Sequence, residues 1–318
     1  MFVISKKYEL SKAALNRAVL FFLQPFARER RWTMDSGWRE YQRTLAKELG
    51  DELAQEFVGS LRLQSRGCVK TATQFFHGLG LRWSPLMHAW SKWVERNAQG
   101  TIAIILRDAK PLTALSRAKS WKQVYLNRLI CGVPDELSGD APGKQQPLLK
   151  RYLGQCGCAE YFTFVDSGCY GTVVLELHKL GMSFRPLFFF SKNPNIRGFL
   201  NEIGVSMAEG EILNDSLECG FPHIYARPSE LVEINRRVGV VLRPSDSLSV
   251  KFGKAAMRGV SDARVGSDVS AREAARAVLR LSQKARRGEF TGVLGHASPE
   301  WSKKKEFLAN WPKHLRWA

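Results

Sequence analysis

Several motifs that identify common enzyme classes are missing from this 318-residue chain. It contains no GxxxxGK[ST], no GxGxxG and no HExxH, which excludes a Walker-type phosphate loop, the dinucleotide fingerprint and the zinc-protease helix. The six histidines are scattered. A lone histidine such as His178 is more often a surface or core residue than a catalytic base. No enzyme class is therefore assigned by a short motif.

Metal-binding and disulfide patterns are also missing from the cysteines. None of the six belongs to a CxxC pair, and the CxC formed by Cys156 and Cys158 has no second pair and no histidine at zinc-finger spacing. We therefore expect no zinc site and interpret the cysteines as reduced, intracellular thiols. Cys169 could be activated, because it falls close to a predicted helix N-terminus, but a small residue filling a turn is the simpler interpretation.

The chain has no long hydrophobic run. The apolar stretch AVLFFLQPF at 18–26 is short, has Lys and Arg on both sides and lacks a small-residue cleavage site. It fits neither a signal peptide nor a membrane span of about 20 apolar residues. We expect an amphipathic helix packed on the body of a soluble, cytoplasmic protein that has no membrane partner.

Acidic residues are in the minority. The sequence has 48 Lys and Arg against 30 Asp and Glu, a formal net charge of +18. Residues 227–318 alone hold 19 basic and 9 acidic residues, so the excess of positive charge is concentrated in this part of the chain. Such a balance favours a polyanionic partner, either nucleic acid or a phosphorylated small molecule. The sequence does not distinguish RNA from DNA.

The spacing of apolar residues divides the chain into three zones. In residues 1–100 they recur every three or four positions, which predicts an N-terminal domain of several helices. Breaks between these helices are expected at Gly50, at SRG (65–67) and at GLGLRWSP (78–85). Residues 101–245 carry short apolar runs separated by segments that suit helices, which is typical of an α/β domain. Residues 246–318 predict a basic, helical C-terminal region. The tryptophans of the first zone (Trp83, Trp90 and Trp93) are expected in the core or at a domain interface rather than on a base-stacking platform.

Four apolar runs predict the strands of the α/β domain: TIAIIL (101–106), QVYL (123–126), YFTFV (161–165) and RPLFFF (185–190). The runs are continuous rather than alternating, which indicates strands covered on both faces, as in a parallel sheet. Helices are expected in the segments 112–120, 145–155 and 172–181, which would give right-handed βαβ units. The run at 237–245 is a further strand candidate.

The residues that follow these strands are candidate ligand-binding residues, because doubly wound sheets bind ligands beyond the carboxyl ends of their strands. Three of the four strand ends carry a cation, and one carries an aspartate followed by two glycines and a threonine. The candidates are Arg107, Asp108 and Lys110 after the first run, Arg128 after the second, and Asp166, Ser167, Gly168, Gly171 and Thr172 after the third.

The segment from Asp166 to Thr172 has the composition of a phosphate- or ribose-binding loop. Its glycines allow close approach of the backbone to a ligand, and a following helix N-terminus favours phosphate. Thr172 could cap that helix or bind a phosphate oxygen. Asp166 is the candidate catalytic residue, since it could accept hydrogen bonds from sugar hydroxyls or hold Mg²⁺ through water. An ordinary strand-to-helix turn is the alternative interpretation.

The order of these elements resembles a phosphoribosyltransferase-type domain over residues 101–193. In that family a strand ending in acidic residues leads into a loop that closes on Gly and Thr, and FVDSGCYGT (164–172) is similar. The segment IAIILRDAKPL (102–112) looks like the family's pyrophosphate element. The resemblance implies a bound ribose 5-phosphate, Mg²⁺ and substitution at the anomeric carbon. The chain departs from the family in having Ser167 at the second acidic position and a shorter loop.

A second candidate surface lies in the C-terminal region, where the segment 267–290 predicts a helix. Ser270 and Glu273 form a capping box at its start, and Gly288 follows its end. Cations recur along one face of this helix at three- and four-residue steps. They are Arg272, Arg276, Arg280, Lys284 and Arg287. Contact with a phosphate backbone and a solvated helix face are equally good interpretations of this stripe.

Three hypotheses for the function follow. The leading one is a phosphoribosyltransferase-like α/β protein, active or degenerate, that works on or beside nucleic acid and has Mg²⁺ as its only cofactor. The second is a non-enzymatic nucleic-acid-binding component with the α/β domain as scaffold. The third is a hydrolase that uses Asp166 on a nucleotide.

Overall fold

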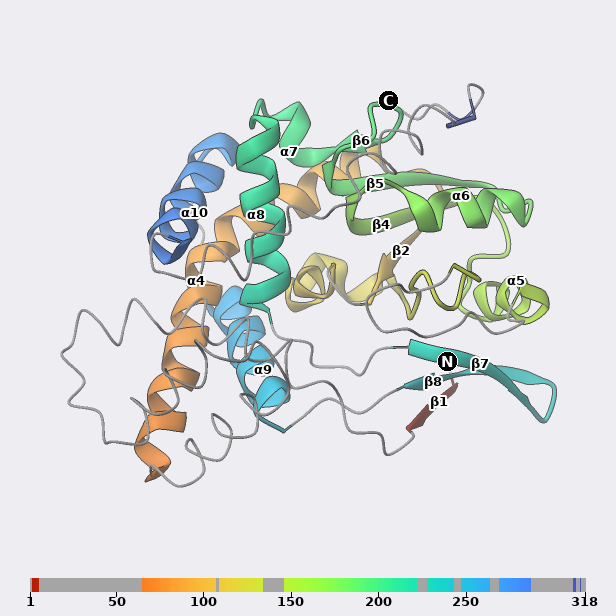
Figure 1. Ribbon diagram of the computed structural model, residues 1–318, viewed down its shortest axis with the longest axis horizontal. Helices are drawn as coiled ribbons and strands as arrows, with labels where there is room; N and C mark the ends of the chain where they lie inside the picture. Colours follow the sequence, from red (N-terminus) through yellow and green to blue (C-terminus); the bar gives the residue numbers. More distant parts are fainter. Residues whose placement is uncertain are drawn as a thin grey trace, which may run out of the picture.

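The computed structural model describes residues 2–5, 65–106, 109–133, 146–221, 228–242, 247–263, 269–286, 311–312 and 315. The chain is an α/β protein. It has one five-stranded parallel sheet with helices on both of its faces, and a second, three-stranded sheet (Figure 1).

The five-stranded sheet has the spatial order β3-β2-β4-β5-β6, and every neighbouring pair is parallel. Its strands are β2 (Thr101–Ile105), β3 (Lys122–Val124), β4 (Phe162–Cys169), β5 (Phe184–Ser191) and β6 (Arg197–Gly198). The four strands predicted from the sequence are confirmed. In chain order the arrangement is 2-1-3-4-5, a doubly wound topology whose direction reverses between the first and third strands. Here these are β2 and β4.

Strand β4 is longer than the sequence indicates. The predicted strand stops at Val165, but β4 continues to Cys169, which pairs with Ser191 of β5. The expected loop from Asp166 to Thr172 is therefore wrong in its extent, because only Tyr170 and Gly171 separate β4 from the next helix. The composition of the segment suits a turn, but the long neighbour β5 supplies backbone partners that extend the ladder.

One long helix replaces the several helices expected around residues 65–97. Helix α4 (Ser65–Asn97) runs without interruption through GLGLRWSP, where the sequence indicates a break. Gly80 faces helix α9 (Ser247–Asp262) so closely that a Cβ atom there would collide with the carbonyl oxygen of Ala256. This glycine therefore permits a close helix crossing, and it does not end the helix.

The other helices take two places around the parallel sheet (Figure 1). Together with α4, the helices α7 (Phe199–Glu202) and α8 (Met207–Gly220) pack on one face, and α9 and α10 (Ala271–Arg286) pack against α4. Helices α5 (Gln146–Gln155) and α6 (Thr172–Lys179) cover the opposite face. The helix expected at 112–120 is instead the pair of short 3₁₀ helices η1 (Lys110–Ala114) and η2 (Ser116–Ser120).

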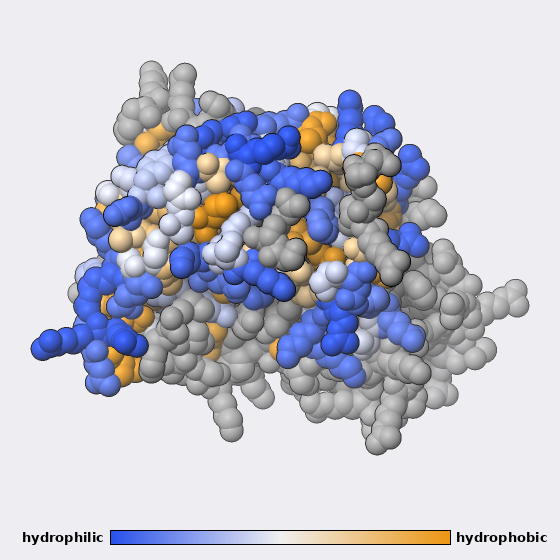
Figure 2. Space-filling view, turned by 180° about the vertical axis from the view of Figure 1, so that it is seen from behind, coloured by the Kyte–Doolittle hydropathy of each residue, from blue (hydrophilic) through white to orange (hydrophobic). Residues whose placement is uncertain are grey.

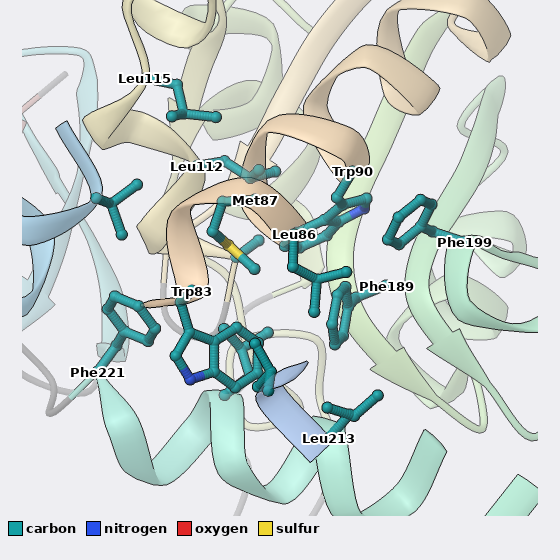
Figure 3. Packing of buried hydrophobic residues seen from close by; sticks show 14 of the residues in the cluster. Trp83, Leu86, Met87, Trp90, Leu112, Leu115, Phe189, Phe199, Leu213 and Phe221 are labelled. Atoms are coloured by element: carbon teal, nitrogen blue, oxygen red, sulfur yellow. The ribbon is translucent and has the colours of Figure 1, made fainter. Parts of the chain in front are cut away.

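Aromatic side chains fill the core between α4 and the sheet (Figure 3). The ring of Trp90 lies 4.8 Å from that of Phe189, and the ring of Trp83 meets Phe221 edge-on at 5.9 Å. The exposed fractions of Trp83, Trp90 and Trp93 are 0%, 0% and 4%. The prediction that these tryptophans belong to the core is confirmed.

The second sheet has the order β1-β8-β7 and packs on α5. Its strands are β1 (Phe2–Ser5), β7 (Pro228–Ile234) and β8 (Arg237–Leu242). The strand predicted at 237–245 thus forms, but outside the parallel sheet, and residues 2–5 form a strand in a zone expected to be helical. The amphipathic helix expected after them lies outside the described residues. None of the helices in the described ranges has the length and apolar content needed to cross a membrane.

Candidate functional site at the carboxyl edge of the sheet

The parallel pairing brings the predicted strand ends to a single edge. Because all five strands run in the same direction, the residues after β2, β3, β4 and β5 emerge on the same side of the sheet. The point where strand order reverses lies between β2 and β4, where ligands of doubly wound proteins bind. Asp166 belongs to β4 at this edge. Arg107 and Asp108, which follow β2, lie outside the described residues.

Asp166 and Ser167 point to opposite faces of the sheet. Side chains alternate along a strand, so Asp166 shares the face of Phe164, which packs toward α5 and α6. Asp166 is half-buried, and its Oδ1 accepts a hydrogen bond of 2.8 Å from the backbone N–H of Ser167. Ser167 is only 2% exposed and lies on the side of α4 and α8. The structure therefore separates these two predicted binding side chains.

Left-handed backbone conformations gather where β4 meets α6. Gly168, Cys169 and Gly171 have φ values of 107°, 97° and 88°. Such values suit glycine, but for cysteine they cost about 1–2 kcal/mol. Gly171 immediately precedes α6 and has no side chain with which to cap it. Thr172 is the first residue of the helix and Gly171 is its N-cap, so of the two roles suggested for Thr172, capping the helix is wrong.

Asparagines after β5 hold this junction in place. Asn193 is buried, and its Nδ2 donates to the carbonyl oxygen of Tyr170 at 3.0 Å. Asn201 accepts from the N–H of Ser191 and donates to its carbonyl oxygen, at 2.9 Å in both bonds. The backbone N–H of Lys192 donates to the carbonyl of Cys169. Sequence reasoning did not identify this bracing, although the SKNPN run after a predicted strand is a turn signal.

Lys192 and Glu211 form an ion pair beside the same junction. The Nζ of Lys192 lies 2.5 Å from Oε1 of Glu211 on α8 and 5.3 Å from the centre of the Tyr170 ring. The Lys192 side chain is 14% exposed. Its burial lowers the pKa, but the hydrogen bond with Glu211 and the charges of Tyr170 and Cys169 outweigh this and raise the pKa of Lys192. A fixed cation therefore stands near the end of β5.

The predicted cations Lys110 and Arg128 lie toward the β3 side of the edge. Lys110 is in η1, and its Nζ donates to Oε1 of Gln123 on β3 at 3.3 Å. Burial lowers the pKa of Lys110 to about 8. Arg128 is exposed in the turn after β3. Of the two, Lys110 is the more sensitive to an added anion, because a negative charge nearby would favour its protonated form.

A tryptophan from the C-terminal segment packs at the start of α6. Trp311 is 5% exposed, and its ring would lie 3.2 Å from a Cβ atom built on Gly171. Its Nε1 donates to the carbonyl oxygen of Leu315 at 2.7 Å. Trp311 thus docks on the body of the protein. The space next to the predicted phosphate-binding helix end is thus partly enclosed.

The predicted cationic stripe lies on the outer face of α10. Arg272, Arg276 and Arg280 are exposed, whereas Ala274 and Val278 are buried. The capping box is confirmed, since Ser270 Oγ lies 2.7 Å from Oε2 of Glu273 and accepts from its backbone N–H. Lys284 lies within α10 but its side chain, like all of Arg287 and the predicted end at Gly288, is outside the described residues.

Acidic residues accompany the first half of this stripe. Hydrogen bonds from Ser206, and more weakly the charges of Arg276 and Arg272, lower the pKa of Glu209 on α8. Glu273 lies on α10 itself, and Ser270 first and Arg276 second lower its pKa. Arg272 and Arg276 therefore have part of their charge compensated within the protein.

No three His, Cys, Asp or Glu side chains come close enough to share a metal ion in the described part of the chain. Mg²⁺ is often held by one carboxylate together with the phosphates of a substrate, and Asp166 supplies one carboxylate at the edge.

Neither the models of known protein families nor the curated protein sequences match this chain.

Proposed function

We propose that the protein binds a nucleotide or sugar phosphate at the carboxyl edge of its parallel sheet, between β2 and β4, as a phosphoribosyltransferase-like or degenerate domain. The observation that carries this proposal is the strand order, which reverses between β2 and β4. Ligands of doubly wound sheets bind at that reversal.

Each residue has a distinct part in the proposal. Asp166 would accept hydrogen bonds from ribose hydroxyls, and its carboxylate would hold Mg²⁺, which would neutralise charge on the phosphates. Lys110 contributes positive charge toward the phosphates, and its lowered pKa rises when an anion binds. The braced junction at Cys169–Gly171 fixes the backbone next to the ligand. The connection between β4 and α6 is shorter than a phosphoribosyltransferase loop, so we propose ligand binding as the function, and transfer requires a separate test.

Thermal unfolding with phosphoribosyl pyrophosphate and Mg²⁺ tests the site. A ligand at 100 times its Kd stabilises the protein by about 2.7 kcal/mol, and we expect Asp166→Asn to lose most of that gain. Glu160→Gln is the matched control, because Glu160 is exposed and precedes the opposite, amino end of β4. The proposal would be refuted if the ligand left the melting temperature of the wild type unchanged, or if it shifted the wild type and Asp166→Asn equally. Release of pyrophosphate in the same samples reports on transfer.

A second candidate function, nucleic-acid binding, is favoured by the exposed arginines of α10. Each phosphate that a protein neutralises contributes about −0.9 to the slope of log K against log salt on duplex DNA. Replacing Arg272, Arg276 and Arg280 together by Gln is expected to make that slope shallower, most through Arg280, which lacks the acidic neighbours of the other two. An unchanged slope would remove α10 from the interface.

A further inference from the structure

Helix α9 carries a second cationic face that the sequence pattern did not reveal. Lys251, Lys254 and Arg258 are exposed and follow one another at three- and four-residue spacing, so they lie on one side of the helix. We define these three residues as the α9 ridge. The single acidic residue in α9 is Asp262 in the last turn, and it is bonded to His77 of α4 at 3.1 Å.

The α9 ridge is held on a rigid support. On the inner side of α9, the ring of Phe252 stacks on Phe76 of α4 at 5.0 Å. The hydroxyl of Ser84 donates to the carbonyl oxygen of Val260 at 2.8 Å. The close approach at Gly80 fixes the distance between the two helices. The apolar side of α9 is thus buried against the core that contains α4, and the charged side faces outward.

Several cations on the described surface are compensated by an acidic neighbour, and those of the ridge are not. Arg151 pairs with Glu233, Lys179 with Glu176, and Lys192 with Glu211. Within the described ranges, neither lysine of the ridge nor Arg258 takes part in an ion pair with an acidic residue. A face that serves only solubility usually mixes both signs. Three uncompensated cations in a row therefore indicate an anionic partner.

We propose that the α9 ridge binds the phosphate backbone of a double-stranded nucleic acid. Lys251 and Arg258 are about 10 Å apart along the helix axis at 1.5 Å per residue. This distance spans about three phosphates of one strand at 3.4 Å each along the duplex axis. We expect these three cations to contact phosphates, which position a protein on the duplex without reading its sequence.

Two other anionic partners fit the ridge less well. Single strands are bound by aromatic platforms, and the one aromatic among the exposed large hydrophobics of the described residues is Tyr161, before the amino end of β4. Membrane surfaces are bound by helices that insert an apolar face, and that face of α9 is buried. On the side of the molecule shown in Figure 2, hydrophobic areas are small and separated.

The α9 ridge shares no residue with the carboxyl-edge site, and it adds a second helix to the α10 candidate. Figure 1 shows α9 and α10 beside different stretches of α4. The two helices can therefore be tested separately, and the melt with phosphoribosyl pyrophosphate reports on neither of them.

Fluorescence anisotropy with a short mixed-sequence DNA duplex, between about 50 and 200 mM salt, tests the ridge. The variant combines Lys251→Gln, Lys254→Gln and Arg258→Gln. The control combines Lys119→Gln, Lys122→Gln and Lys150→Gln, which removes the same charge from exposed positions on η2, β3 and α5. We expect the ridge variant to make the log–log slope shallower by about 2.7, the product of three contacts and 0.9, and the control to keep the wild-type slope.

Several outcomes would overturn the inference. A wild-type protein that does not bind the duplex, or a ridge variant that keeps the wild-type slope, removes α9 from the interface. Equal weakening by the ridge variant and the control shows attraction by net charge alone. Tighter binding to a length-matched oligothymidine or to phosphatidylserine vesicles assigns the ridge to another partner. Matching melting temperatures of the two variants exclude misfolding as the cause of a difference.

Discussion

The carboxyl edge of the parallel sheet and the outer faces of α9 and α10 are built in opposite ways. At the edge, each group depends on another: Asn193 holds Tyr170, Asn201 holds Ser191, and Lys192 is paired with Glu211. On the outer helices, the cations have few partners, and the backbone beneath them is regular.

The carboxyl edge therefore positions individual groups precisely, whereas the outer helices contribute through the sum of their charges. At the edge, left-handed residues and buried amides fix the backbone, so a single replacement should disturb both stability and the site. On α9 and α10, each cation acts independently through a screened field. Single replacements there should leave the fold intact and weaken binding in small, additive steps.

The largest loss is expected for Gly168→Ala. A Cβ atom at Gly168 would collide with the carbonyl oxygen of Phe190, and φ is 107°. Together, left-handed strain and overpacking should lower the free energy of unfolding by about 2–4 kcal/mol in urea titrations. Gly181→Ala is the control, because its φ is 69° but nothing lies within 4 Å. If the free energy of unfolding falls equally in both variants, the close contact between β4 and β5 at Gly168 does not contribute to the loss.

Asn193→Ala should lower the free energy of unfolding by about 1–3 kcal/mol, because it leaves buried hydrogen-bonding groups without their partner. It should also reduce stabilisation by phosphoribosyl pyrophosphate. Asn235→Gly, in the β7–β8 turn at φ 50°, should change the stability by less than about 0.5 kcal/mol. Normal stability of Asn193→Ala would show that the SKNPN turn does not need its bracing.

The pKa of Lys110 predicts a rise in stability at alkaline pH. The amine has a pKa of about 8 in the folded chain and 10.5 as its ordinary value, so the unfolded chain binds more protons between these values. Stability should therefore increase from pH 8 toward 10.5, by at most about 1.4 kcal/mol per pH unit and less where solvent screens the charge. Lys110→Met should flatten that part of the curve in urea titrations across this range. If Lys110→Met and the wild type have the same dependence of unfolding free energy on pH, other titrating groups determine that dependence.

The smallest effects on stability are expected on the outer helices. Lys254→Gln and Arg280→Gln should each change the free energy of unfolding by less than about 0.5 kcal/mol. Each should make the salt slope for duplex binding shallower by about 0.9. Loss of all binding from one such replacement would show a specific contact, and would contradict the view that these cations act through their summed charge.

The sequence predicted those features that depend on local pattern. The continuous apolar runs of β2, β3 and β5 and the capping box at Ser270 are local signals, and the structure contains them. The extension of β4 was missed, because Ser167 and Gly168 suit a turn until a longer neighbouring strand offers backbone partners. The continuity of α4 was missed for a similar reason, since Gly80 serves a contact with a distant helix.

The candidate site was predicted in its location but not in its construction. Parallel strands bring their ends together, so Asp166, Lys110 and Arg128 could be assigned to one edge. The separation of Asp166 from Ser167 depends on β4 continuing as a strand. The hydrogen bonds of Asn193 and Asn201 and the contact of Trp311 depend on turn geometry and on residues far apart in the chain.

The contact between Trp311 and Gly171 has a consequence for biosynthesis. Domains fold during synthesis from the N-terminus onward, and every strand of the parallel sheet precedes Trp311 in the chain. The sheet can therefore assemble on the ribosome while the start of α6 still lacks its aromatic neighbour. A nascent chain stalled before Trp311 would carry the complete sheet with an uncovered helix end, a state that a pulse of protease during translation could detect.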